Sequence, residues 1–187
     1  MAHAYTAKAI NRALKCGVTS IEHGNLLDIK SIELLKRNDA YLVPTLIIYK
    51  ALIEQGVEAG LSKEMVEKTY EVLDAGIEAL SFADKNDVQI VYGTDLLGIM
   101  HPRQLEEFNL RSKVISPLKL LQQATINASK LFNMSNSIGQ VKEGFFADLI
   151  VLDKNPIEDI SILTKPNKHL KLVIKDGRIC LNNEKIN

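Results

Sequence analysis

Three residues with side chains that can bind a divalent metal stand where β-strands are expected to end. His3 lies in the sequence AHA, His23 in IEHG and Asp95 in YGTD. The stretches before His23 and Asp95 are apolar and have glycine beside them, which indicates a strand followed by a turn. Two imidazoles and a carboxylate are ligand types of catalytic zinc and iron sites. The pattern therefore predicts a metal centre assembled from three strands.

The elements that must position these residues alternate between short apolar strands and longer helices. The predicted strands cover residues 18–22, 40–45 and 88–92. The predicted helices cover residues 6–15, a segment capped by Asp28, a long segment capped by Ser62, and residues 103–112 and 116–132. Residues 46–61 are expected to form a long connection. Alternation of this kind predicts parallel βα units and an α/β fold, in which ligands gather at the carboxyl ends of the strands.

The pattern changes after Asn136 to short strands separated by glycines. The predicted strands here cover residues 147–152, 169–174 and 178–181. The sequence KDGR at residues 175–178 predicts a tight hairpin, because Asp-Gly suits a type I′ turn. Three strands are too few to bury two faces of a sheet, so this part is expected to pack on something else.

Composition excludes several classes of protein. The formal net charge of zero gives no electrostatic reason to expect nucleic acid or an anionic membrane as a partner. The longest apolar runs, at residues 41–49 and 147–152, are too short to span a bilayer, and no signal peptide is recognisable. We therefore expect a cytoplasmic protein in which Cys16 and Cys180 are buried or half-buried reduced thiols.

The motifs of the chain resemble the second half of metal-dependent hydrolases of the amidohydrolase superfamily. The closest branch is similar to imidazolonepropionases and to Xaa-Pro dipeptidases, or prolidases. The resembling segments follow the family's order over nearly the whole chain. They are His3, GVTSIEHG at 17–24, VPT at 43–45, GTD at 93–95, AT and NA within 124–128, IG at 138–139, GFFADLIVL at 144–152 and KDG at 175–177.

This resemblance implies a particular fold and a site. Residues 1–136 would form strands five to eight of a TIM (β/α)8 barrel, and residues 137–187 the C-terminal strands of a small β-sandwich. His3 would end strand five, His23 strand six and Asp95 strand eight.

The resemblance also implies a chemistry. His3 and His23 would bind one divalent metal, with zinc expected first and manganese or iron as alternatives. Asp95 would contact a second metal and act as general base while metal-activated hydroxide attacks the carbonyl. The implied substrate is a small amide, a cyclic amide or an X-Pro-like dipeptide, cleaved at a C–N bond.

The sequence departs from the family pattern in its first half. It contains no His-x-His pair, which the family carries on strand one, and the family's strand-four lysine would lie upstream of Met1. A complete barrel needs roughly 250 residues, whereas about four βα units are expected here. Because only two residues precede His3, strand five is expected to be nearly absent. These features predict a truncated chain, from a split gene, a shortened product or an artificial boundary.

Several alternatives stay open. As a non-catalytic half-barrel remnant, or as one subunit of a split enzyme, the chain would be stable only by association with itself or with an N-terminal half-barrel. His3 can be a disordered terminal residue, His23 a core histidine and Asp95 a helix cap. His101, within the loop after Asp95, can face substrate or solvent. His169 is expected to be structural or to lie on the surface.

Overall fold

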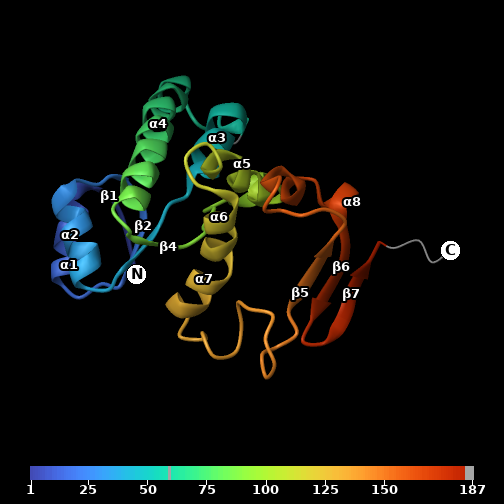
Figure 1. The fold of residues 1–187 in the computed structure, drawn as a ribbon. Coiled ribbons are helices and arrows are strands. Elements are labelled where there is room, and N and C mark those ends of the chain that lie inside the picture. The colour runs from blue at the N-terminus through green and yellow to red at the C-terminus, as the bar shows by residue number, and fades with distance from the viewer. Residues whose placement is uncertain (59, 184–187) are drawn as a thin grey trace. The chain divides into compact units, whose positions relative to one another are not determined.

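The computed structural model describes residues 1–58 and 60–183 and divides the chain into two compact units, Met1–Ile115 and Ser116–Asn187. Each unit has its own sheet, and each is described by itself (Figure 1). The boundary predicted from sequence lies at residues 136–137, within the second unit.

The first unit is built on a parallel sheet with the strand order β1-β2-β3-β4. Its strands are β1 (Ala2–Thr6), β2 (Ser20–Leu26), β3 (Tyr41–Val43) and β4 (Gln89–Ile90). Its α-helices are α1 (Ala7–Lys15), α2 (Ile29–Arg37), α3 (Leu46–Gln55), α4 (Lys63–Lys85) and α5 (Glu107–Arg111), the last preceded by the 3-10 helix η1 (Gly98–Glu106). Ile21, Leu42 and Ile90, each from a different strand, are buried.

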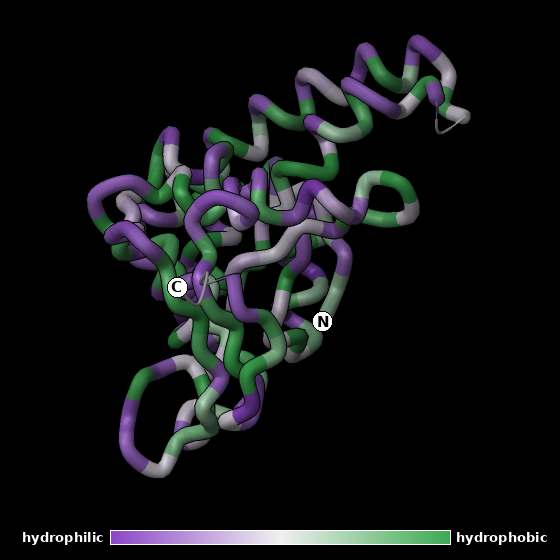
Figure 2. The backbone as a smooth tube through the Cα atoms, turned by 90° about the vertical axis from the view of Figure 1, so that its right-hand side faces the viewer, coloured by the Kyte–Doolittle hydropathy of each residue, from purple (hydrophilic) through white to green (hydrophobic). Residues whose placement is uncertain are grey.

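Side-chain caps explain where the helices of this unit begin. The Thr6 hydroxyl accepts a hydrogen bond from the Ala9 amide at the start of α1, and Ser62 accepts one from the Met65 amide at the start of α4. Asp28 and Ser31 form a reciprocal capping box at the start of α2. The caps predicted at Asp28 and Ser62 are confirmed. Hydrophilic and hydrophobic residues alternate along α4, the longest helix, as expected where one face packs on α3 and β2 (Figure 2).

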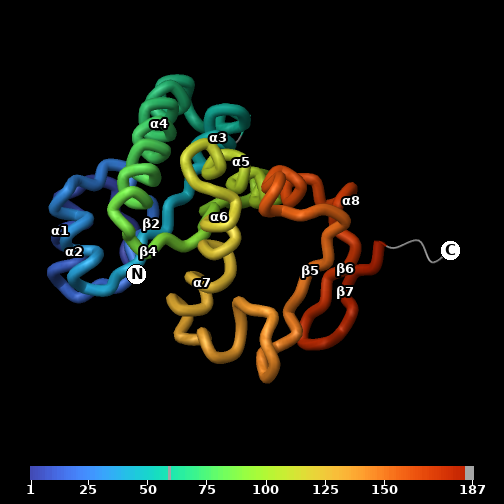
Figure 3. Tube along the Cα trace, in the orientation of Figure 1, coloured from blue at the N-terminus to red at the C-terminus, as the bar shows by residue number. Residues whose placement is uncertain are grey.

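The second unit combines short helices with an antiparallel sheet. Its helices are α6 (Pro117–Ala124), α7 (Ile126–Leu131), the 3-10 helix η2 (Ile160–Thr164) and α8 (Pro166–His169). Its strands are β5 (Leu149–Leu152), β6 (Leu170–Lys175) and β7 (Arg178–Asn182), in the order β5-β6-β7 (Figure 3). Asp176 and Gly177 both have positive φ, at 49° and 75°, as a type I′ turn requires. The predicted hairpin is confirmed.

Two helical predictions are wrong. The expected connection at residues 46–61 contains α3, whose sequence LIIYKALI is apolar on nearly all sides. A buried helix of this kind shows little amphipathic period, so the sequence pattern hides it. The helix expected at residues 116–132 breaks at Thr125, whose hydroxyl donates 2.6 Å to the carbonyl of Leu121 and whose backbone leaves the helical region.

Two further expectations are corrected. Strand five is present as β1, because its five residues are held by a parallel ladder with β2. Cys16 and Cys180 are free but exposed, the first at the end of α1 and the second on β7, whose residues are all exposed. Across residues 1–58 and 60–183, no helix is long and apolar enough to cross a membrane. The α/β fold, with part of a TIM barrel followed by a separate antiparallel sheet, agrees with the prediction.

Candidate metal centre

Two of the predicted ligands, His3 and His23, lie against each other. Their strands β1 and β2 are parallel neighbours, with His3 opposite Glu22 and Ala4 opposite His23. The Nδ1 atom of His3 is 3.1 Å from the Nε2 atom of His23. The structure therefore brings two imidazole nitrogens together from two strands, although both histidines lie within their strands and not at the last residue.

An irregularity in β2 explains how the His23 ring reaches His3. The ladder with β1 shifts register beyond Ala4 and His23, so that Thr6 pairs with Leu26. His23 and Gly24 have φ values of 74° and 68°, and a Cβ on Gly24 would overlap the Leu42 side chain. A bulge of this kind redirects a side chain, and left-handed non-glycine residues cluster at functional sites.

The other ring nitrogen of His23 is fixed by a hydroxyl. Its Nδ1 lies 2.8 Å from Oγ1 of Thr45, which follows β3. The ring also stacks on Tyr5 with centroids 4.5 Å apart and planes 9° apart. Tyr5 and His3 are two residues apart on β1 and so share one face of that strand. His23 is 5 % exposed, and its ring is held by contacts from both neighbouring strands.

The electrostatics around His23 favour its neutral form. Burial lowers the pKa of His23, the nearby Asp95 carboxylate opposes this shift, and His3 lowers the pKa further. A neutral imidazole is the form that binds a metal, and a ligand histidine commonly has its second nitrogen engaged as Thr45 engages this one. The donor chemistry and the convergence of the two nitrogens therefore fit a divalent cation.

The third predicted ligand, Asp95, is held less closely. It lies beyond β4, is exposed and has φ of 55°, and its carboxylate acts on His23 electrostatically. The turn before it runs close to β3, since a Cβ on Gly93 would lie 2.6 Å from Cγ1 of Val43. Within residues 1–58 and 60–183 no three His, Cys, Asp or Glu side chains are grouped closely enough to hold a metal. Asp95 thus lies near the histidine pair without joining it.

A buried ion pair lies at the ends of β3 and β4, the strands that precede Thr45 and Asp95. Arg111 and Glu107 on α5 both have side chains with no exposed surface, and Arg111 Nε donates 2.6 Å to Glu107 Oε1. The guanidinium also donates to the carbonyls of Pro44, Val91 and Gly93, with distances of 3.1 Å to Val91 and 3.5 Å to Gly93. One side chain therefore joins the backbone after β3 to the backbone after β4.

Glu107 extends this support to α3. Its second oxygen accepts a hydrogen bond of 2.6 Å from the Ile47 amide, in the first turn of that helix. Burial raises the pKa of Glu107, and the adjacent Arg111 guanidinium opposes that rise. The pair is thus a structural tie, formed where the two strand ends and α3 meet.

The supports of the site that the sequence does not predict are Tyr5, Thr45 and the Arg111–Glu107 pair. Thr45 was part of the VPT motif, but nothing in its type indicated a contact with His23. The pair had one usable signal, which is an acid and a base four residues apart in a short segment with apolar Phe108 and Leu110. That spacing is equally typical of an exposed helix face.

The remaining histidines lie elsewhere. His101 is exposed on η1, and its Nε2 is 2.8 Å from the side-chain nitrogen of Gln104. His169 in the second unit is 4 % exposed and lies 2.8 Å from Asp153 Oδ1. The structural role predicted for His169 is confirmed, whereas a substrate contact by His101 stays a prediction.

A parallel sheet with helices between its strands, and a histidine pair on two neighbouring strands, are features of metal-dependent (β/α) barrel hydrolases. Residues 1–180 match the Amidohydrolase family. The chain belongs to that family.

Proteins similar to this chain include an ochratoxinase, a prolidase and a Xaa-Pro dipeptidase. Ochratoxinase of Aspergillus niger is 32 % identical over 180 residues, which are 95 % of this chain and 37 % of that enzyme. A crystal structure of a prolidase complexed with N-methylphosphonate-L-proline is 40 % identical with a TM-score of 0.93, over 98 % of this chain and 45 % of the other. A Xaa-Pro dipeptidase with methionine in its active site is 31 % identical with a TM-score of 0.82, over 95 % of this chain and 43 % of the other. The resemblance to the prolidase branch is confirmed, and this chain spans less than half the length of each of these relatives.

Proposed function

We propose that this chain forms one half of the active site of a metal-dependent amidohydrolase that cleaves a C–N bond of a small amide, a cyclic amide or an X-Pro-like dipeptide. The observation that carries the proposal is the pair of facing nitrogens on His3 and His23, 3.1 Å apart on adjacent parallel strands. The family and two relatives support the substrate class, because the family is that of the amidohydrolases and the relatives are named a prolidase and a Xaa-Pro dipeptidase.

Each residue has a stated part in this proposal. His3 and His23 would hold a divalent metal, zinc before manganese or iron, and the hydrogen bond to Thr45 would keep the His23 ring in place. When bound, the metal would supply Lewis-acid activation of water and of the amide carbonyl. Asp95 would accept the proton that the attacking water loses, since it is an exposed carboxylate within electrostatic reach of His23. His101 would contact substrate from the following loop.

We further propose that the remaining ligands come from an N-terminal half-barrel, because the matched relatives are more than twice as long as the segment they share with this chain. In the parallel sheet described here β1 and β4 are the edge strands, each with one side open to further pairing. A second half-barrel would continue the sheet at both edges and complete the ligand set.

Metal binding to the 187-residue chain tests the proposal directly. We expect isothermal titration with zinc to give one site, and the variant His23→Ala to weaken it by about 100-fold or more, since a pair of ligands becomes a single one. His101→Ala is the matched control, because it removes an exposed imidazole outside the pair. Equal zinc affinity in the wild-type chain and in His23→Ala contradicts the proposal.

A non-catalytic half-barrel that is stable only by association is the second candidate. The observation that favours it is the apolar exposure of the second unit, where Ile150, Phe146 and Ile179 are 55 %, 52 % and 62 % exposed. Size exclusion with light scattering would then give an oligomer, and zinc would not bind. A monomer that binds zinc at His23 contradicts this second candidate.

A further inference from the structure

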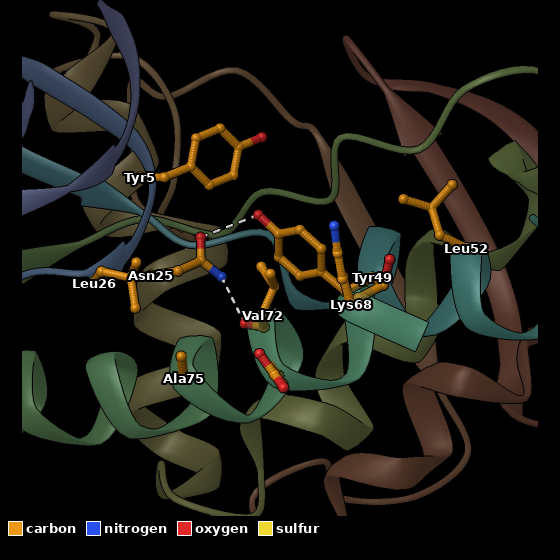
Figure 4. Close-up of a pocket in the computed structure, with 10 residues that line it drawn as sticks. Tyr5, Asn25, Leu26, Tyr49, Leu52, Lys68, Val72 and Ala75 are labelled. Carbon is orange, nitrogen blue, oxygen red and sulfur yellow. Dashed lines mark hydrogen bonds between the residues drawn. The ribbon is translucent and has the colours of Figure 1, made fainter. Parts of the chain in front are cut away.

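The first unit contains a pocket beside the histidine pair that no step of the proposed chemistry uses. It has a volume of about 410 Å³ and lies among β1, β2, α3 and α4 (Figure 4). Its lining comprises Tyr5, Asn25, Leu26, Tyr49, Leu52, Lys68, Thr69, Glu71, Val72 and Ala75. A volume of this size lies in the range of small-molecule sites.

One wall of the pocket is shared with the candidate metal centre. Tyr5 lines the pocket and its ring stacks on His23 at 4.5 Å. Tyr49, on another wall, is 6 % exposed, and burial together with the nearby Tyr5 raises the pKa of its phenol, so it stays a neutral donor. A molecule whose reacting bond faces His23 could therefore extend past Tyr5 into the pocket.

The polar groups deepest in the pocket are already engaged. The Tyr49 hydroxyl donates 3.0 Å to Oδ1 of Asn25, and Nδ2 of Asn25 donates 3.0 Å to the carbonyl of Val72. Figure 4 shows this chain of hydrogen bonds running from α3 across β2 to α4. Leu26, Leu52 and Ala75 add apolar surface around it. An apolar group can fill such a space without separating a buried polar atom from its partner.

Two charged residues of α4, Lys68 and Glu71, line this pocket and distinguish one end of a ligand from the other. Lys68 is exposed, and its side chain extends from α4 toward the pocket in Figure 4. Its ammonium group can pair with a carboxylate that stays in water while the rest of the ligand enters the pocket. Glu71, one turn further along α4, would repel the same carboxylate and so restricts where it lies.

We propose that this pocket binds the branched or aromatic side chain of an amide substrate whose carboxylate pairs with Lys68. The inference rests on the proposed function for the identity of the ligand as a substrate. The pocket, which lies between α3 and α4, would then select amide substrates by the side chain that they carry.

Binding of non-reacting probes to the 187-residue chain tests the pocket without requiring catalysis or metal. N-acetyl-L-leucine is expected to shift the methyl NMR signals of Leu26, Leu52 and Val72. N-acetylglycine, which lacks the side chain, should bind about tenfold more weakly or less well still, given what missing methylenes cost in an apolar pocket. Equal binding of the two probes, or no shift of these signals at millimolar concentrations of either, overturns the proposal.

Two variants with one control separate the apolar and the charged contributions. Ala75→Phe fills the pocket and should weaken N-acetyl-L-leucine by about tenfold or more, whereas Glu67→Phe, at an exposed position of α4 outside the lining, should not. Lys68→Met should weaken N-acetyl-L-leucine by roughly two- to fivefold, as for an exposed ion pair, and leave N-acetyl-L-leucinamide unchanged. Unchanged affinity in Ala75→Phe overturns the pocket, and unchanged affinity in Lys68→Met overturns the carboxylate contact.

These outcomes are independent of the proposed function. His3→Ala, which like His23→Ala removes one imidazole of the pair, should weaken zinc binding by about 100-fold or more. It should leave the affinity for N-acetyl-L-leucine within about twofold, since His3 is not part of the lining. Probe binding without zinc binding would remove the metal proposal and keep the pocket. Zinc binding without probe binding would do the reverse.

Discussion

The two sides of the candidate metal centre are held in different ways. His23 is buried, and neutral contacts fix it: a hydrogen bond to Thr45, a ring stack on Tyr5 and a bulge in β2. Asp95 is exposed beyond a strand of only two residues, and charged groups hold the backbone around it. The histidine side is therefore fixed by neutral contacts within the sheet, whereas the backbone on the carboxylate side is held by ion pairs on α3, η1 and α5.

Those ion pairs lie at two depths. Arg111 reaches the Val91 and Gly93 carbonyls from the interior. Nearer the surface, η1, which begins at Gly98, is joined to α3 through Arg103 and Glu106. Variants that remove the buried ion pair or a surface ion pair measure how much each contributes to stability on the Asp95 side.

Arg111→Met is expected to have the largest effect. It leaves the Glu107 carboxylate buried without its guanidinium, and breaking one partner of such a pair costs about 3–5 kcal/mol of unfolding free energy. Denaturant unfolding measures this cost. The double variant Arg111→Met with Glu107→Leu should recover part of it, because no uncompensated charge is then left in the interior. If Arg111→Met alone is as stable as the wild type, the pair does not stabilise the backbone on the Asp95 side.

Thr45→Val tests the His23 side. It keeps the shape of the side chain and removes the hydroxyl beside His23 Nδ1, so the ring loses the contact that orients it. Loss of such a partner typically weakens metal binding by about 10- to 100-fold, which titration with zinc measures. Thr69→Val removes a hydroxyl that bonds the Met65 carbonyl on α4, and it should leave zinc affinity unchanged. Equal effects of the two variants contradict the role given to Thr45.

Much of the first unit could be predicted from sequence because its signals are local. Asp28 and Ser62 mark helix starts through hydrogen bonds to residues three positions away. The apolar stretches before His23 and Asp95 predicted parallel strands, which the structure contains as β2 and β4. By contrast, the first eight residues of α3 contain one polar residue, Lys50, so the sequence shows little helical period there.

The supports of the site could not be predicted because they depend on distant parts of the chain. The bulge at His23 is defined by pairing with β1, and no residue type at this position indicates it. Arg111 bonds the carbonyl of Pro44, which lies 67 positions earlier. Every residue has a backbone carbonyl, so a sequence does not indicate which carbonyl a side chain will bond. Such a partner is identified only from the fold.

A smaller effect is expected from the backbone conformation of Asp95, whose φ is 55°. A non-glycine residue at a left-handed φ costs roughly 1–2 kcal/mol, although aspartate tolerates it better than most. Asp95→Gly should therefore be about 1 kcal/mol more stable than Asp95→Ala in denaturant unfolding. Asp87, exposed with φ of 56°, offers the same pair of substitutions away from the centre. A difference at Asp87 but none at Asp95 would mean that the Asp95 backbone is free to relax.

The surface layer predicts a pH dependence, which is the smallest effect. Hydrogen bonding to Arg103, and secondarily to Lys50, lowers the pKa of Glu106 to about 2. Because the folded pKa lies below the unfolded value of about 4.5, this carboxylate contributes stability above that value. The contribution is lost as pH falls from about 4.5 toward 2.

The size of that contribution is limited by solvent. The side chain of Glu106 is 34 % exposed, so screening reduces the gain to about 1 kcal/mol or less. Glu106→Gln should lower the unfolding free energy by that amount at neutral pH and by progressively less below pH 4.5, and added salt should shrink the difference. Thermal unfolding of both proteins between pH 3 and 7 measures it. A constant gap across this range would show that Glu106 acts by packing, and that charge does not hold η1 against α3.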